Sequence, residues 1–312
     1  MGRVAVIDLG TNSSRLLVAE VEDGRLTELV RRTEVTRLGE GVDSSGRLAE
    51  DAMERVFATL AEYREQIDQH RADKIVAVAT SAVRDAANGD YFREQLNERF
   101  GIQAKTISGD QEALLTFKGA TADLPEADTE LTMVNDIGGG STEFVVGRAG
   151  HWPDFHVSTK LGSVRHTERF LSNDDPPSAE QLARAREEIA TIIEEGVPAE
   201  VRAKATRGIA VAGTATSLAA IDQCLDPYDP ERVHGYELTR EATKEILETL
   251  RAQTTEERAQ TPGLLPARAP TIVAGAAVLA EIYAAFDLST LTVSEHDILH
   301  GAALEAAESP AD

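Results

Sequence analysis

The chain contains an internal repeat. The segment Asp8–Ser14 (DLGTNSS) recurs as Asp136–Thr142 (DIGGGST), and aligned residues such as Asp8 and Asp136 lie 128 positions apart. Each copy follows a short apolar stretch and precedes one charged residue and a second apolar stretch. Two apolar stretches joined by a glycine-containing turn are typical of a β-hairpin. The repeat therefore predicts a duplicated α/β fold, with two similar lobes around a central cleft.

The rest of each half alternates helical and strand patterns, as an α/β lobe requires. In the first half, apolar residues at helical spacing predict a helix over 48–69, and short apolar runs predict strands at 75–79 and 102–107. In the second half, the same patterns predict a helix over 178–196 and a strand at 209–212.

A segment poor in apolar residues, 123–130 (DLPEADTE), separates the two halves. Acidic and proline-containing stretches of this kind are typical of connections rather than of packed elements. We therefore expect an N-terminal lobe over 1–124 and a C-terminal lobe over 125–312. A helix predicted over 295–307 is a candidate to complete the first lobe.

Composition narrows the class of protein. The chain has 31 Lys and Arg against 54 Asp and Glu, a formal net charge of −23, which disfavours DNA, RNA or an anionic membrane as its partner. No apolar run approaches the roughly 20 residues of a membrane-spanning helix, and Val4–Ile7 has a strand pattern rather than that of a signal peptide. We therefore expect a cytoplasmic protein. The single cysteine, Cys224, excludes an intrachain disulfide.

The two glycine turns are candidate phosphate-binding loops. In such a turn, successive backbone N–H groups can converge on one anion, with hydroxyl groups beside them. A plain hairpin turn would not need aspartate and serine at matched positions of both copies. The predicted phosphate-binding residues of the two turns are Gly10, Thr11, Asn12, Ser13, Gly138, Gly139, Gly140, Ser141 and Thr142. Asp8 and Asp136, which lead the turns, are predicted to hold a hydrated magnesium or manganese ion.

Glu112 is a candidate catalytic base. Ser108 and Gln111 have capping-box spacing at the start of a predicted helix, which places Glu112 in the first helical turn. The helix dipole there favours an ionised carboxylate, which could accept a proton near neutral pH. An ordinary first-turn glutamate is the alternative.

Two further segments follow predicted strands. Arg84 lies where α/β proteins bind ligands and could clamp phosphate, although a surface pair with Asp85 or Asp90 is the alternative. Gly213 and Thr214 open a predicted helix whose N–H groups could bind phosphate. A close-packed helix start is the alternative for these two residues.

Two groups of basic residues remain. His296 and His300 have the spacing of zinc ligands on one helix, but no third soft ligand is evident, so an exposed terminal helix is the favoured interpretation. With a net charge of −23, a polyanion would need local cations, and Lys160, Arg165 and His166 are candidates beside Arg84.

Together these segments resemble the exopolyphosphatase and guanosine pentaphosphate phosphohydrolase (Ppx/GppA) family, in its short two-domain form. The resemblance runs from Val4 to about Leu304. The motifs that carry it are Ile7–Ser13, Thr80–Asp85, Ser108–Ala113, Asp136–Glu143, Leu161–Arg165 and Ala212–Thr216. It implies two duplicated ribonuclease-H-like lobes of the actin, sugar kinase and heat-shock ATPase superfamily.

The resemblance also implies an activity. It implies a hydrolase that removes the terminal phosphate of inorganic polyphosphate, or of guanosine pentaphosphate (pppGpp), with magnesium. It implies that Glu112 is the catalytic base that activates water, that Glu143 helps to organise the water and the metal, and that Arg84 binds phosphate. Gln111 and Pro270 depart from the family pattern, which has glutamate and aspartate at these positions.

Three alternatives stay open: hydrolysis of pppGpp, an ATP-dependent kinase in which 212–214 covers an adenosine, and a non-catalytic phosphate or nucleotide sensor. The chain ends at Asp312, before the helical domain of larger relatives, and its surface is acidic, so we expect a preference for short polyphosphate chains. A homodimer is the expected assembly, since a groove across two cores would extend the binding surface.

Overall fold

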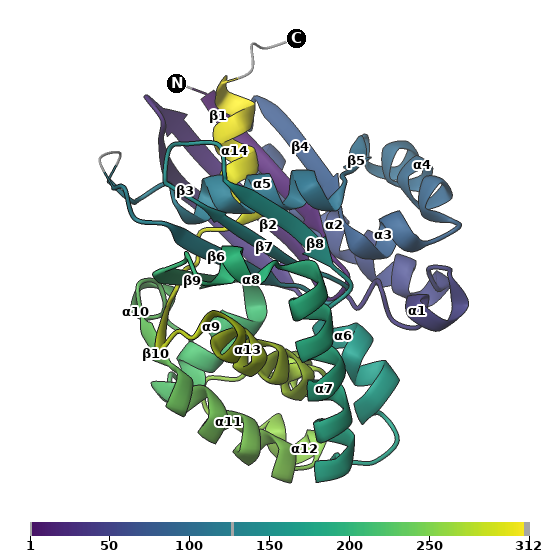
Figure 1. The fold of residues 1–312 in the computed structure, drawn as a ribbon. Helices are drawn as coiled ribbons and strands as arrows, with labels where there is room; N and C mark the ends of the chain where they lie inside the picture. The colour runs from purple at the N-terminus through teal and green to yellow at the C-terminus, as the bar shows by residue number, and fades with distance from the viewer. Residues whose placement is uncertain (1, 126–127, 309–312) are drawn as a thin grey trace. The chain divides into compact units, whose positions relative to one another are not determined.

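The computed structural model describes residues 2–125 and 128–308 and divides the chain into two compact units (Figure 1). Unit 1 comprises the residues up to Gly119 together with those from Ile298 onward, and unit 2 comprises Ala120–Asp297. The chain therefore passes from unit 1 to unit 2 after Gly119, where the sequence pattern predicted 124–125, and returns after Asp297, so that the C-terminal helix belongs to unit 1 as the sequence pattern had suggested.

Unit 1 is built on a five-stranded sheet of order β3-β2-β1-β4-β5. Its strands are β1 (Gly2–Leu9), β2 (Ser14–Glu22), β3 (Arg25–Glu34), β4 (Lys74–Ala79) and β5 (Ala104–Thr106). The first three form an antiparallel meander, and β4 and β5 continue the sheet in parallel with β1. Its helices are α1 (Val42–Ser45), α2 (Glu50–His70), α3 (Ser81–Asp85), α4 (Gly89–Phe100), α5 (Gly109–Ala120) and α14 (Ile298–Glu308).

Both faces of the unit 1 sheet are covered. Alternate residues of a strand point to opposite faces, and β1 has apolar residues for both. Ile7 packs in a cluster with Phe57 of α2, and Val6 packs in a second cluster with Leu299 of α14. A Cβ on Gly301 would lie 1.8 Å from the backbone oxygen of Leu115, so glycine at this position allows α14 to approach α5 closely.

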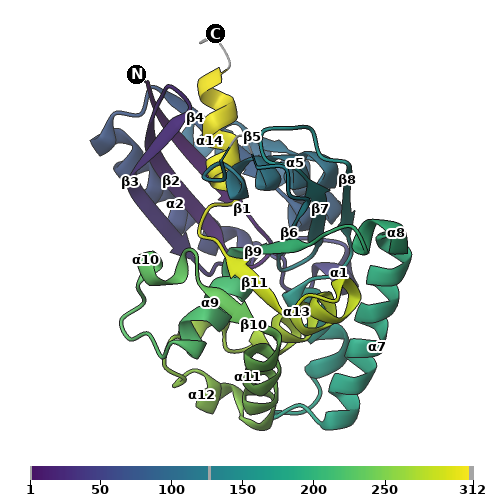
Figure 2. The ribbon, with the colours of Figure 1, turned by 60° about the vertical axis from the view of Figure 1, so that its left-hand side comes forward.

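Unit 2 is built on a six-stranded sheet of order β10-β11-β9-β6-β7-β8. Its strands are β6 (Thr132–Ile137), β7 (Thr142–Gly147), β8 (Phe155–Thr159), β9 (Arg207–Val211), β10 (Glu237–Thr239) and β11 (Thr290–Val293). Its helices are α6 (Ser163–His166), the π-helix η1 (Thr167–Leu171), α7 (Ala179–Gly196), α8 (Ala199–Arg202), α9 (Ala212–Asp222), α10 (Pro230–Val233), α11 (Arg240–Ala252), α12 (Thr255–Arg258), the 3₁₀ helix η2 (Pro266–Arg268) and α13 (Ile272–Phe286). The apolar helix α13 packs against α7, α9 and α11, which lie near it in both views (Figure 1 and Figure 2).

The two sheets share one topology. The order β3-β2-β1-β4-β5 of unit 1 corresponds to β8-β7-β6-β9-β11 of unit 2, with an antiparallel meander followed by two parallel strands in each. This arrangement, present twice, is the ribonuclease-H-like duplication of the actin, sugar kinase and heat-shock ATPase superfamily. The duplicated α/β fold predicted from the sequence repeat is therefore confirmed within each unit.

Several predicted elements differ in their bounds. The strand predicted over 102–107 spans only Ala104–Thr106, and the strand predicted over 209–212 ends at Val211. The terminal helix begins at Ile298 rather than at 295, because the Ser294 hydroxyl binds both backbone groups of His296 and holds that residue in a turn. Most of α14 is buried, so the prediction of an exposed terminal helix is wrong. Among the described residues, no helix combines the length and apolarity needed to cross a membrane.

Candidate active site

The two glycine turns have the same geometry. The hairpin β1–β2 closes at the pair Leu9 and Ser14, and β6–β7 closes at the aligned pair Ile137 and Thr142. In unit 1 the N–H of Gly10, the first turn residue, donates to the carbonyl of Ser13, the fourth, at 3.0 Å. In unit 2 the N–H of Gly138 donates to the carbonyl of Ser141 at the same distance. A Cβ on Gly10 would lie 2.9 Å from the Ser13 oxygen, so the turn requires glycine there.

In unit 1 the turn is held by the segment that follows β3. Gly39 N–H donates to the Thr11 carbonyl at 2.8 Å, and Arg37 N–H donates to the Asn12 carbonyl at 2.9 Å. A Cβ on Gly39 would lie 2.2 Å from Thr11 Cγ2, so this approach requires glycine. Because the C=O and N–H of one trans peptide point in opposite directions, the N–H groups of Asn12 and Ser13 point away from the supporting segment.

In unit 2 the support comes from the start of α6. Ser163 N–H donates to the Gly138 carbonyl at 3.0 Å, and Val164 N–H donates to the Gly139 carbonyl at 2.9 Å. Arg165 Nε donates to the Gly140 carbonyl at 2.9 Å. The N–H groups of 139–141 therefore point away from α6, and successive N–H groups that point in one direction are the arrangement that binds an anion.

The residue that lies opposite the aspartate, across the hairpin, differs between the two units. In unit 1, Asp8 pairs across the hairpin with Arg15, whose Nε and Nη2 donate to Asp8 Oδ2 at 2.9 and 2.7 Å. Both side chains are largely buried. The sequence repeat did not anticipate this pair, which gives the buried Asp8 carboxylate a cationic partner from its own hairpin.

In unit 2, two carboxylates take those positions. Asp136 pairs across the hairpin with Glu143, and both side chains are buried. Glu143 pairs in turn with Ser158 of β8, whose hydroxyl donates to Glu143 Oε1 at 2.7 Å. Like charges directly opposite one another on a sheet are destabilising. Two hard carboxylates at this position fit a divalent cation such as Mg²⁺ or Mn²⁺, and they stand beside the turn whose N–H groups suit phosphate.

The predicted cap before Glu112 is present. Ser108 and Gln111 exchange both bonds of a capping box, at 3.1 and 3.2 Å, and Glu112 lies in the first turn of α5 with 8% exposure. Arg84 of α3 donates to Glu112 Oε2 at 3.1 Å and to the Ile107 carbonyl at 2.9 Å. Unit 1 therefore brings Arg84 and Glu112 together, as a site that binds phosphate and activates water would require.

Asp90, one of the two surface partners considered for Arg84, pairs with another residue. Asp90 forms its ion pair with Arg93, at 2.6 Å, rather than with Arg84.

The start of α9 is tightly packed. A Cβ on Gly213 would lie 1.5 Å from Arg268 Nη1, and a Cβ on Gly275 would lie 2.6 Å from Thr214 Oγ1. The Arg268 guanidinium therefore packs against Gly213, which fits the close-packed helix start considered for these residues. No pattern in the sequence pointed to Arg268, because it lies in a proline-rich connection far from α9 along the chain.

One of the predicted basic residues is not a surface cation. His166 is fully buried and stacks on Phe170, with ring centroids 6.0 Å apart, and burial lowers its pKa. Burial also lowers the pKa of Arg165, whose Nε binds the Gly140 carbonyl. The prediction that His166 contributes to a basic surface patch is therefore wrong, since a buried imidazole with a lowered pKa is neutral at pH 7.

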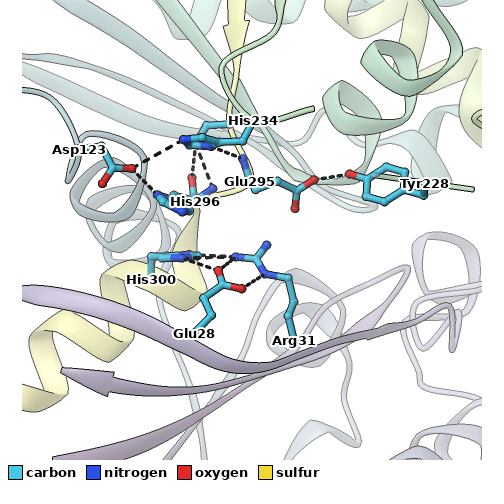
Figure 3. Close-up of polar contacts among 9 residues, drawn as sticks. Glu28, Arg31, Asp123, Tyr228, His234, Glu295, His296 and His300 are labelled. Carbon is cyan, nitrogen blue, oxygen red and sulfur yellow. Dashed lines mark hydrogen bonds and ion pairs between the residues drawn. The ribbon is translucent and has the colours of Figure 1, made fainter. Parts of the chain in front are cut away.

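His296 belongs to a cluster within unit 2 (Figure 3). Asp123 Oδ2 lies 2.6 Å from His296 Nδ1 and 3.8 Å from His234 Nε2. The N–H of Glu295 donates to His234 Nδ1 at 3.2 Å, so a neutral His234 ring carries its hydrogen on Nε2, toward Asp123. A metal ion would need the lone pair of that nitrogen. We interpret the cluster as a hydrogen-bonded link between the two segments in which the chain enters and leaves unit 2.

His300 has different partners, in unit 1 (Figure 3). It is buried on α14, and its Nε2 lies 2.9 Å from Glu28 Oε1 on β3, which also pairs with Arg31 at 2.8 Å. His296 precedes the helix that contains His300, so the two residues do not form the helical pair that their spacing suggested.

Known proteins of one kind are similar to this chain over almost its whole length. The profile of the Ppx/GppA phosphatase family matches residues 17–309. Exopolyphosphatase 2 of Mycobacterium tuberculosis is 37% identical over 318 aligned residues, which cover 98% of each chain.

Solved structures of the same family are similar to this chain in fold. The crystal structure of the Aquifex aeolicus member of the Ppx/GppA protein family has a TM-score of 0.81 and 32% identity, and the match covers 99% of each chain. An exopolyphosphatase from Cytophaga hutchinsonii has a TM-score of 0.87 and 27% identity, with 97% of this chain and 98% of that chain covered. Sequence and fold thus agree along the full length, and the chain belongs to the Ppx/GppA phosphatase family.

Proposed function

We propose that this protein is an exopolyphosphatase, a hydrolase that removes the terminal phosphate of inorganic polyphosphate by cleaving a phosphoric anhydride bond. The relative from Mycobacterium tuberculosis that bears this name matches 98% of the chain. The observation that carries the proposal is the Asp136–Glu143 pair beside the Gly138–Ser141 turn, because it joins a donor set for a divalent cation to a set of N–H groups for phosphate.

Asp136 and Glu143 are the residues that would hold the cation. When bound, a divalent cation neutralises negative charge on the phosphates as the transition state develops. The N–H groups of the Gly138–Ser141 turn orient the terminal phosphates, and such orientation is the main contribution a protein makes to phosphoryl transfer. Arg84 adds a guanidinium that can donate to a phosphate oxygen as well as to Glu112.

Glu112 accepts the proton of the attacking water. A new bond forms between the water oxygen and the terminal phosphorus, and the bridging P–O bond breaks, so that the shortened chain leaves with the electron pair of that bond. The water proton goes to a carboxylate oxygen of Glu112, which Arg84 holds in a fixed orientation. Inorganic phosphate and a chain shorter by one phosphate are the products.

The sequence repeat predicted that Asp8 holds the metal, but in this proposal Asp8 has a different role. Arg15 already compensates its charge at 2.7 Å, so Asp8 fixes the Arg15 guanidinium beside the first phosphate turn rather than holding the metal. In this proposal, the metal-binding site lies in unit 2.

The test is phosphate release from polyphosphate of defined length, with Mg²⁺ and without any acceptor. We expect free phosphate from the wild-type chain and at most about a hundredth of that rate from Glu112→Gln. Transfer that requires an acceptor would instead identify a kinase. Release from pppGpp alone, run in parallel, would move the substrate to the nucleotide while leaving the reaction type unchanged.

A further inference from the structure

We infer that Ser158 is a positioning residue that orients the metal-binding carboxylate Glu143. The inference rests on the proposed function only in taking Asp136 and Glu143 as the metal ligands. Three neighbouring strands of unit 2 carry the residues concerned in one row, because Asp136 of β6 pairs with Glu143 of β7, and Glu143 pairs with Ser158 of β8.

The contact is specific. Ser158 Oγ donates to Glu143 Oε1 at 2.7 Å, the length of a charge-assisted O–H···O bond. Glu143 has 1% exposure, so its carboxylate needs hydrogen-bond partners within the protein. A glutamate side chain has three rotatable torsions, and a donor fixed on the neighbouring strand restricts them. Ser158 therefore sets which way the Glu143 carboxylate faces.

The equivalent row of unit 1 shows why a neutral donor matters. That row consists of Asp8, Arg15 and Thr33, and the Arg15 guanidinium compensates the charge of the row. A serine hydroxyl orients a carboxylate without adding a positive charge. Ser158 thus adds no positive charge to the row of Asp136 and Glu143, whereas a basic residue in its place would add one.

When a residue that orients a metal ligand is replaced, the affinity for the metal falls. Loss of such an outer hydrogen bond weakens metal binding by about 10- to 100-fold in other proteins. We expect Ser158→Ala to weaken Mn²⁺ binding by about tenfold or more and to raise the Mg²⁺ concentration for half-maximal activity by a similar factor. Ser158→Thr keeps the hydroxyl on a strand position that accepts β-branched residues, so its affinity should stay within about threefold of wild type.

The experiment is a Mn²⁺ titration followed by electron paramagnetic resonance of the free ion, on the full chain and without substrate. The matched control is Ser172→Ala, which removes a hydroxyl bonded to the Glu168 carbonyl on the exposed surface of the same unit. We expect wild type, Ser172→Ala and Ser158→Thr to bind Mn²⁺ alike and Ser158→Ala to bind it more weakly. Should Ser158→Ala fail to fold, Ser158→Cys, which is similar in size but a poor donor, replaces it.

Unchanged Mn²⁺ affinity in a folded Ser158→Ala protein would overturn the inference, even if its melting temperature fell. Wild-type protein that does not bind Mn²⁺ would overturn it as well. Failure of the proposed function is seen separately: Mn²⁺ binding with the expected Ser158 dependence but no phosphate release from polyphosphate would reject the exopolyphosphatase and leave the role of Ser158 standing.

Discussion

The hairpins β1–β2 and β6–β7 share one backbone design but differ in charge. Both close a four-residue turn with the same hydrogen bond of 3.0 Å, and in both an aspartate lies two residues before the turn. Opposite that aspartate, unit 1 has Arg15 and unit 2 has Glu143. One residue thus decides whether a cation or a second carboxylate lies opposite the aspartate. The duplication preserves the backbone of the turn, and the carboxylate at this position is the reason for our proposal that the metal binds in unit 2.

The largest effect is expected when unit 2 is given the charge pattern of unit 1. Glu143→Arg should lower phosphate release by at least about a thousandfold, because the metal loses one ligand and meets a positive charge. The melting temperature should change little, since the new arginine can pair with Asp136 as Arg15 pairs with Asp8. Phosphate-release assays check the activity, and thermal unfolding checks the melting temperature. Substantial activity in this variant would show that the metal does not bind at this site.

The second prediction concerns what unit 1 contributes in place of a metal ligand. Glu112→Gln should lower kcat by about a hundredfold or more, the scale of losing a positioned base, while the Mg²⁺ requirement stays unchanged. Steady-state kinetics over a series of Mg²⁺ concentrations separates the two effects. A shifted Mg²⁺ requirement with normal kcat would instead place Glu112 among the metal ligands.

A smaller effect is expected for the cation that orients this base. Arg84→Ala should lower kcat/KM by about tenfold, because it removes a charged hydrogen bond to Glu112 and a donor for phosphate. Arg251→Ala is the matched control, since Arg251 pairs with Glu248 on α11. Equal kinetics of the two variants would show that Arg84 is only a structural partner of α5.

The smallest predicted effect is on acid stability and concerns unit 1 alone. Burial raises the pKa of Glu28, but hydrogen bonds and charge from His300 and Arg31 outweigh it and lower this pKa to about 2. A folded-state pKa below the unfolded value stabilises the protein above pH 4.5 and loses that stabilisation as pH falls from 4.5 toward 2. Because the Glu28 side chain is 35% exposed, the contribution should be at most about 1 kcal/mol.

Urea unfolding of wild type and Glu28→Gln checks this prediction. The difference in unfolding free energy should be present at pH 7 and should shrink at pH 3. A difference that grew on acidification would contradict the assigned direction.

The sequence predicted features that depend on neighbours along the chain. The glycine turns, the capping box at Ser108 and Gln111, and the buried face of α2 all follow from local spacing, and each is present. The Arg15–Asp8 pair could also have been predicted, since a hairpin that closes at Leu9 and Ser14 places Asp8 opposite Arg15.

Other features depend on contacts between distant segments. Ser158 reaches Glu143 only through the register of β7 with β8, and Arg268 reaches Gly213 from a connection that no local pattern relates to α9. The burial of His166 likewise depends on how α6 packs within unit 2 rather than on its neighbours in sequence. Periodicity and motif spacing contain no information on such packing, so these parts of the site required the structure.

The assignment of the metal to unit 2 is tested most directly by Mn²⁺ binding to Asp8→Asn and Asp136→Asn measured side by side. Asp136→Asn should weaken binding by more than about tenfold, because it removes a carboxylate ligand. Asp8→Asn should bind Mn²⁺ as wild type does and instead lower the free energy of unfolding by about 3 kcal/mol, since it leaves the Arg15 charge without its counter-ion. Equal losses of Mn²⁺ affinity in the two variants would contradict the account and return a metal ligand to each unit.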